Sequence, residues 1–136
     1  KPRITLLTLG VDDLERAVTF YRDGLGFFTQ GIVGREFENG AVAFFELERG
    51  LRMALWPRRS IAADSGLPQQ PSSATEVTLG HNVGSRDEVE LRIEDVGEAV
   101  EPAPVLQRVE VEADDAVLAM SAGYIPRPWG SGAALR

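Results

Sequence analysis

Residues 4 to 27 read ITLLTLGVDDLERAVTFYRDGLGF and carry the strongest structural signal in the chain. The first seven residues are mostly apolar or β-branched, which is typical of a buried strand. Asp12 and Glu15 then have the spacing of a capping box and predict the start of a helix. Four apolar residues share one face of that helix: Leu14, Ala17, Val18 and Tyr21. Gly24 and Gly26 are placed to end it.

A β-hairpin is predicted over residues 41 to 56. A three-residue loop that ends in a left-handed Gly50 would pair Leu47 with Leu51 and Glu46 with Arg52. In that register one face forms a core and carries Phe45, Leu47, Leu51, Met53 and Leu55. The opposite face carries Phe44, Glu46, Arg52, Ala54 and Trp56. This second face mixes apolar and charged residues, so it suits the wall of a pocket better than open solvent.

The second half of the chain gives weaker signals. Residues 57 to 74 hold three of the eight prolines and show no strong periodicity, which predicts a linker. The run EVTLGHNV at 76–83 predicts a strand, and Ser85 with Glu88 predicts a helix start. Alternation within residues 89–93 would also suit a strand, although the helix is favoured.

Beyond Pro104 the patterns are shorter. VLQRVEVE at 105–112 predicts a strand, and residues 114–122 suggest a short capped helix. The segment 124–136 is rich in Gly, Pro and Ala and suits a strand, a loop or a tail equally well.

An internal repeat relates the two halves. A shift of 72 residues sets Leu6–Val18 against Thr78–Glu90, and both segments then read as strand, turn, capping box and helix. A second alignment matches VDDLERAV at 11–18 with IEDVGEAV at 93–100. The first alignment is preferred because it keeps the hairpin and the linker inside one module.

The opening segment follows the pattern V-x-D-L-x-x-A-x-x-F-Y-x-x-x-L-G-F. Its matching positions are Val11, Asp13, Leu14, Ala17, Phe20, Tyr21, Leu25, Gly26 and Phe27. This pattern resembles the start of the vicinal oxygen chelate superfamily, which includes glyoxalases, bleomycin-resistance proteins and extradiol dioxygenases. MALWPR at 53–58 and VTLGHNVGS at 77–85 are similar to a bacterial glyoxalase-like branch of it.

The resemblance implies an α+β fold in which tandem βαβββ modules form a curved, cup-like mixed sheet with helices outside. We therefore expect a single domain over residues 1–136, with modules at about 3–57 and 75–136 joined by the linker at 58–74. The last third departs from the family because no closing D-P-D-G-H-x-W-E-like segment occurs. Trp129 and AGY at 122–124 are its nearest counterparts.

The resemblance also locates the family's metal-ligand positions, on the first and last strands of each module. Here they fall on Leu6, Ala54 and Thr78. Leucine and alanine cannot coordinate a divalent ion and a lone threonine is a poor ligand, so we expect no metal site and no cofactor.

His81 is the sole histidine. Its parity is opposite to that of Thr78, so it should point toward the helix side of its strand. A structural, hydrogen-bonded role is favoured over a general base or lone metal ligand, because no carboxylate partner is visible.

Composition excludes several classes of function. The net charge of −7 disfavours nucleic-acid binding, because a phosphate backbone would be repelled. No apolar stretch is long enough to span a membrane, and the start shows no signal peptide. The chain has no cysteine, which suits a reducing compartment, and we expect a cytoplasmic protein.

These observations favour a protein that binds a small, partly apolar molecule in a cleft between the modules. The candidate ligand-binding residues are Phe44, Glu46, Arg52, Trp56, Thr78 and Asn82. Glu46 and Arg52 could instead form a structural cross-strand ion pair. No catalytic residue is identified, since nucleophile elbows and phosphate-binding loops are absent.

Two alternatives stay open. One is a metal-dependent lyase, isomerase or dioxygenase of the same superfamily, with ligands such as Glu46 and His81. The other is a non-catalytic interaction module whose hairpin face is a dimer interface. The resemblance itself implies a homodimer.

Overall fold

A computed structural model of the chain describes residues 1–71, 76–100, 106–110 and 116–121, the last two ranges as backbone strands. The elements in chain order are β1 (Leu6–Val11), α1 (Leu14–Thr19), the π-helical turn η1 (Phe20–Gly24), β2 (Thr29–Val33), β3 (Val42–Glu46), the short 3₁₀ turn η2 (Glu48–Gly50), β4 (Arg52–Pro57), α2 (Arg58–Ser65), β5 (Thr78–Val83), α3 (Arg86–Ala99), β6 (Leu106–Glu110) and β7 (Ala116–Ser121).

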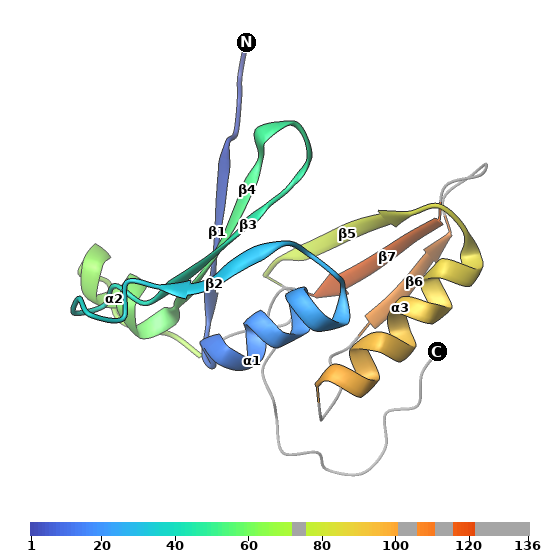
Figure 1. Ribbon diagram of the computed structural model, residues 1–136. Coiled ribbons are helices and arrows are strands. Elements are labelled where there is room, and N and C mark those ends of the chain that lie inside the picture. Colours follow the sequence, from blue (N-terminus) through green and yellow to red (C-terminus); the bar gives the residue numbers. More distant parts are fainter. Residues whose placement is uncertain (72–75, 101–105, 111–115, 122–136) are drawn as a thin grey trace.

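The strands form two sheets (Figure 1). Sheet A has the order β1-β4-β3-β2, in which β1 and β4 are parallel and the other neighbours antiparallel. Sheet B has the order β5-β7-β6 and is antiparallel. The predicted α+β fold with a mixed sheet is confirmed, and the first module is the expected βαβββ unit.

The 72-residue repeat is confirmed by the bounds of the elements. β1 starts at Leu6 and β5 at Thr78, while α1 starts at Leu14 and α3 at Arg86. Each of these pairs differs by 72 residues. The alternative alignment is wrong, because it would set the end of β1 against the middle of α3.

The second module departs from the first in its pairing. β5 lies beside β7 and antiparallel to it, whereas β1 lies beside β4 and parallel to it. In the first module β3 runs antiparallel to β4, and therefore also antiparallel to β1. Because β7 runs antiparallel to β5, it corresponds in direction to β3 and not to β4. The segment 122–136, where the closing motif was sought, lies outside the described residues.

The helix caps agree with the sequence in one case and correct it in the other. Ser85 accepts a hydrogen bond from the backbone N–H of Glu88 at 3.2 Å, and the Glu88 carboxylate accepts one from Gly84 at 2.8 Å. For α1 the cap is Asp13, which accepts from the Arg16 N–H at 3.0 Å, and the prediction of Asp12 was wrong. β1 continues to Val11, so the helix starts later than predicted. Asp13, one residue after Asp12, is the extended residue whose carboxylate oxygen faces the helix.

Sheet A has a buried face and an open face, as the hairpin pattern predicted. Glu46 pairs with Arg52, the Leu47 N–H donates to the Leu51 carbonyl at 2.8 Å, and Gly50 has a φ of 76°. The buried face carries Phe45, Met53 and Leu55, all almost inaccessible to solvent. Each such side chain contributes about 1.5–3 kcal/mol through burial, so this face anchors the first module.

Two segments differ from their predicted structure. Residues 58–65 of the expected linker form α2, with Pro57 just before it and a left-handed Gly66 (φ 70°) just after it. That arrangement of proline and glycine is a helix signal that hydrophobic periodicity does not reveal. Residues 116–121 form β7, so the predicted helix over 114–122 is wrong. Its apolar run suits either structure, and pairing with β5 and β6 decides.

The two modules meet through helices. Figure 1 shows α1 and α3 next to each other on the same side of the molecule, and α3 packs against η1. Gly24 lies at the contact: a Cβ atom there would be 2.9 Å from Val96 Cγ2 and 3.2 Å from Val96 Cα. The joint therefore depends on the absence of a side chain at this position.

We predict that Gly24→Ala lowers the free energy of unfolding by about 1–3 kcal/mol, because the added methyl group overpacks the joint. Urea denaturation measures the change. Gly97→Ala is the matched control, since no atom lies within 4 Å of the position that its methyl group would take and it should gain about 0.5–1 kcal/mol as a helical alanine. Equal stability of Gly24→Ala and the parent chain would contradict the close packing.

Candidate ligand-binding site

The open face of sheet A is built from the residues that alternate with the buried ones. Register places Leu6, Arg52 and Glu46 in one row across β1, β4 and β3. Thr8, Ala54 and Phe44 form the next row. Strand alternation alone thus turns an aromatic ring and two opposite charges toward the same side.

Phe44, Glu46 and Arg52 form a connected cluster on this face. Arg52 Nε lies 2.9 Å from Glu46 Oε1, and the guanidinium carbon lies 4.7 Å from the centroid of the Phe44 ring. About half of each charged side chain is exposed, so the ion pair contributes only ~0.2–1 kcal/mol. The cluster is weak enough for a ligand to rearrange it.

A pocket of about 120 Å³ lies against this cluster. Its other lining residues come from β2 and the residue before it: Phe28, Thr29, Gln30, Gly31 and Val33. The Thr29 hydroxyl donates to the Phe44 carbonyl at 2.7 Å and accepts from the Gly31 N–H at 3.1 Å. This bonding accompanies an irregularity in the β2–β3 register, which gives β2 the bend that encloses the pocket.

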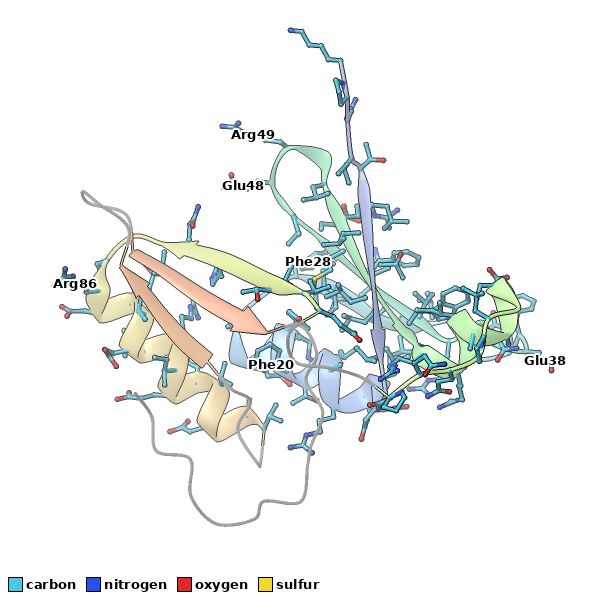
Figure 2. All side chains as sticks on the ribbon, turned by 180° about the vertical axis from the view of Figure 1, so that it is seen from behind. Phe20, Phe28, Glu38, Glu48, Arg49 and Arg86 are labelled. Atoms are coloured by element: carbon cyan, nitrogen blue, oxygen red, sulfur yellow. The ribbon has the colours of Figure 1, made fainter. Side chains whose placement is uncertain are left out.

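Sequence reasoning missed the five lining residues at β2, and Phe28 is the aromatic one among them. It follows Phe27, which is half-buried, and is itself largely exposed. Neighbouring side chains of an extended segment point to opposite sides, so two consecutive aromatic residues are a signal that one of them lies away from the core. Figure 2 labels Phe28, and it also shows Glu48 and Arg49 at the free tip of the β3–β4 turn.

Only part of the predicted site is brought together. Phe44, Glu46 and Arg52 share the pocket. Trp56 lies elsewhere on the open face, where its indole N–H donates to the Asn39 carbonyl at 2.8 Å and supports the β2–β3 loop. Two other predicted residues, Thr78 and Asn82, are exposed on β5 of sheet B and do not line the pocket.

His81 lies on the inner side of β5, as its parity predicted. Its ring packs edge-on against Phe27, with centroids 5.0 Å apart. Burial lowers the pKa of His81, and the nearby positive charge of Arg92 lowers it further, while Glu88 opposes them. The imidazole is therefore a neutral packing group between β5 and α3 at pH 7.

The family's metal-ligand positions do not fit a metal ion. Leu6 is 49% exposed on the open face, and Ala54 is buried in the same face. Neither side chain has a donor atom. Within residues 1–71 and 76–100, no three His, Cys, Asp or Glu side chains gather closely enough to hold an ion.

No helix in the described part of the chain has the length and apolarity to cross a membrane.

Comparison with known proteins gives one matching family and several solved structures of similar fold. Residues 3–30 match the bleomycin resistance protein-like N-terminal family. The structure is similar to a glyoxalase-related enzyme from Fulvimarina pelagi, with a TM-score of 0.64 and 24% identity over 90% of this chain and 83% of that one. No curated protein matches the chain.

Two further solved structures share the fold. A hypothetical protein from S. aureus has a TM-score of 0.58 and 19% identity over 87% of this chain and 85% of that one. A glyoxalase/bleomycin resistance protein/dioxygenase from Nocardioides has a TM-score of 0.51 and 22% identity, over 90% and 79%. The resemblance to the vicinal oxygen chelate superfamily is thus confirmed, by sequence for the opening segment and by fold for most of the chain.

The depressed pKa of His81 predicts a pH dependence of stability. Because the folded state holds this pKa below the ordinary value of about 6.5, the unfolded chain binds the extra proton first as the pH falls. The stabilisation by neutral His81 is complete above that value and is lost progressively below it. His81→Gln should flatten the fall in unfolding free energy between about pH 6.5 and 5, where carboxylates contribute little. An unchanged slope in urea titrations of the variant would refute the buried, neutral assignment.

Proposed function

We propose that this chain, which has the opening segment of the bleomycin resistance protein-like family on a glyoxalase-related fold, binds a small, partly apolar molecule against the open face of sheet A. The observation that supports the proposal is the cluster of Phe44, Arg52 and Glu46 beside the β2 pocket. An aromatic surface with a few polar groups is the usual composition of a small-molecule site.

The cluster suggests which ligand groups are recognised. A flat apolar part would stack on the Phe44 ring and displace the guanidinium that now covers it. Polar groups of the ligand would then bind Arg52 and Glu46 in place of the ion pair that these two residues form with each other. At the Phe44 pocket, where the Arg52 guanidinium is already paired with Glu46, the net charge of −7 favours a neutral or cationic ligand over an anionic one.

We propose that no metal ion takes part. Leu6, Ala54 and Thr78 occupy the positions at which the family resemblance places ligands; the first two have no donor atom and a lone threonine is a poor ligand. The ligands considered for a metal-dependent lyase, isomerase or dioxygenase also lie apart. Glu46 is paired with Arg52 on the open face of sheet A, and His81 is on the inner side of sheet B.

In this proposal a second copy of the chain supplies the missing wall of the Phe44 pocket. A pocket of about 120 Å³ is smaller than the ~300–1,000 Å³ typical of ligand sites, so it needs another wall. β1 is an edge strand of sheet A, and Leu6 and Leu7 at its start are exposed, as is Ile4 just before it. Figure 1 shows that this end of β1 projects beyond α1. A homodimer would cover these apolar residues and enlarge the pocket.

Ligand binding is tested with bleomycin as the probe, in a thermal-unfolding assay. Binding should stabilise the protein by about 2.7 kcal/mol at a hundredfold excess over Kd. Phe44→Ala should remove most of this gain because the stacking surface is lost. Phe37→Ala, an exposed phenylalanine of the β2–β3 loop outside the pocket, is the matched control and should keep it. A midpoint that rises equally in both variants would place binding elsewhere.

The homodimer is tested by sedimentation velocity at micromolar concentration. The parent chain should sediment as a dimer, and the double change Ile4→Glu and Leu6→Glu should yield monomers because it charges the apolar edge. Leu91→Glu, at an exposed leucine of α3, should leave the dimer intact. A monomeric parent chain would rule out this part of the proposal.

A further inference from the structure

Helix α2 covers the end of the open face opposite the β3–β4 turn (Figure 1). Its approach depends on Gly10 of β1, where a Cβ atom would lie 2.9 Å from Arg58 Cγ and 3.2 Å from Ile61 Cδ1. The missing side chain lets the first turn of α2 rest directly on the strand. This helix therefore forms a second wall above the face.

A cavity of about 300 Å³ lies between α2, β1 and the segments on either side of residues 72–75. It is lined by Thr8, Leu9, Gly10, Arg58, Ile61, Ala62, Ser65, Leu67, Pro68, Gln69, Gln70, Glu76 and Val77. None of these residues lines the Phe44 pocket. The cavity is at the lower end of the size range of small-molecule sites, so it suits a compact ligand.

Arg58 gives the cavity its polar anchor. Its side chain is only 16% exposed, and its nearest acidic group, Asp12 Oδ1, is 3.7 Å from Nη1. Among the described residues no acceptor lies within 3.5 Å of its nitrogens in hydrogen-bonding geometry. A guanidinium has five N–H donors, and one so sheltered from water is strongly stabilised by an acceptor. The described residues thus leave N–H donors of this anchor available to a ligand.

The rest of the lining supplies an apolar surface. Leu67 is 67% exposed and Val77 is 40% exposed, although both are large aliphatic residues. Ile61 and Ala62 of α2 face the same space and are partly buried. A molecule in the cavity would remove this apolar surface from water, which is favourable by roughly 25 cal/mol per Å².

The charges of the lining select a monoanion. Arg58 is the one basic residue and Glu76 the one acidic residue among those that line the cavity. A doubly charged phosphate would need more than a single guanidinium partner shared with Asp12 in a protein of net charge −7. A carboxylate matches the planar, two-donor edge of one guanidinium.

We propose that the α2 cavity is a second binding site, which takes a small organic monocarboxylate with an apolar body. The carboxylate accepts hydrogen bonds from Arg58, and the body packs between Ile61, Leu67 and Val77. This site is distinct from the Phe44 pocket and stands whether or not that pocket binds a ligand.

Isothermal titration calorimetry with phenylacetate tests the proposal, with the uncharged phenylacetamide as the matched ligand. The parent chain should bind phenylacetate, and phenylacetamide at least tenfold more weakly. Arg58→Gln should raise the Kd for phenylacetate at least tenfold, while the neighbouring Arg59→Gln, which does not line the cavity, should leave it unchanged. Ala62→Phe fills the cavity without a change of charge and should abolish binding.

Several results would overturn the proposal. They are the absence of phenylacetate binding to the parent chain, equal binding of acid and amide, and equal losses in the Arg58 and Arg59 variants. Circular dichroism of each variant confirms folding, and loss of fold in Arg58→Gln leaves Ala62→Phe as the deciding variant. Phe44→Ala should bind phenylacetate as the parent chain does, so failure of the Phe44 pocket and failure of the α2 cavity give different patterns.

Discussion

The packing of Tyr21 against Phe45 joins the helical layer to sheet A. Tyr21 comes from η1 and Phe45 from β3, and their ring centroids are 5.7 Å apart. Tyr21 also contacts Phe27 at 6.0 Å, and Phe27 contacts His81 of the second module at 5.0 Å. Burial raises the pKa of Tyr21, so its hydroxyl stays neutral in this cluster. One chain of aromatic contacts therefore joins the helical layer to both sheets.

Because the helices seal one face of sheet A, alternation along the strands determines what the other face presents. The residues that alternate with Phe44, Glu46 and Arg52 along β3 and β4 fill the core. Among the described residues, these three side chains contact one another and line the β2 pocket. The face is thereby free to bind a ligand without disturbing the core. α2 closes the far end of the same face over Gly10, so two pockets of different character occupy one side of one sheet.

Local patterns predicted the elements whose boundaries depend on nearby residues. The hairpin register, the left-handed Gly50 and the Ser85 cap depend on interactions within a few residues, and all three were confirmed. β7 was mistaken for a helix because its conformation depends on pairing with β5 and β6, which are distant in sequence.

The candidate site was predicted in part for the same reason. Phe44, Glu46 and Arg52 belong to one hairpin, so parity alone places them together. Thr78 and Asn82 belong to another sheet, and their position relative to that hairpin depends on how the modules pack. Phe28 and the α2 cavity were not predicted. The place of Phe28 in the pocket depends on the bend of β2, and the cavity depends on helix α2, and no periodic pattern in the sequence predicts either feature.

The central claim is that the open face of sheet A is the ligand-binding surface. Backbone amide shifts recorded by NMR during a titration with bleomycin test it most directly. We expect the perturbed amides to cluster in residues 42–46 and 52–56 and around Phe28, with α3 unaffected. Perturbations centred on α3, or spread evenly over the chain, would contradict the claim.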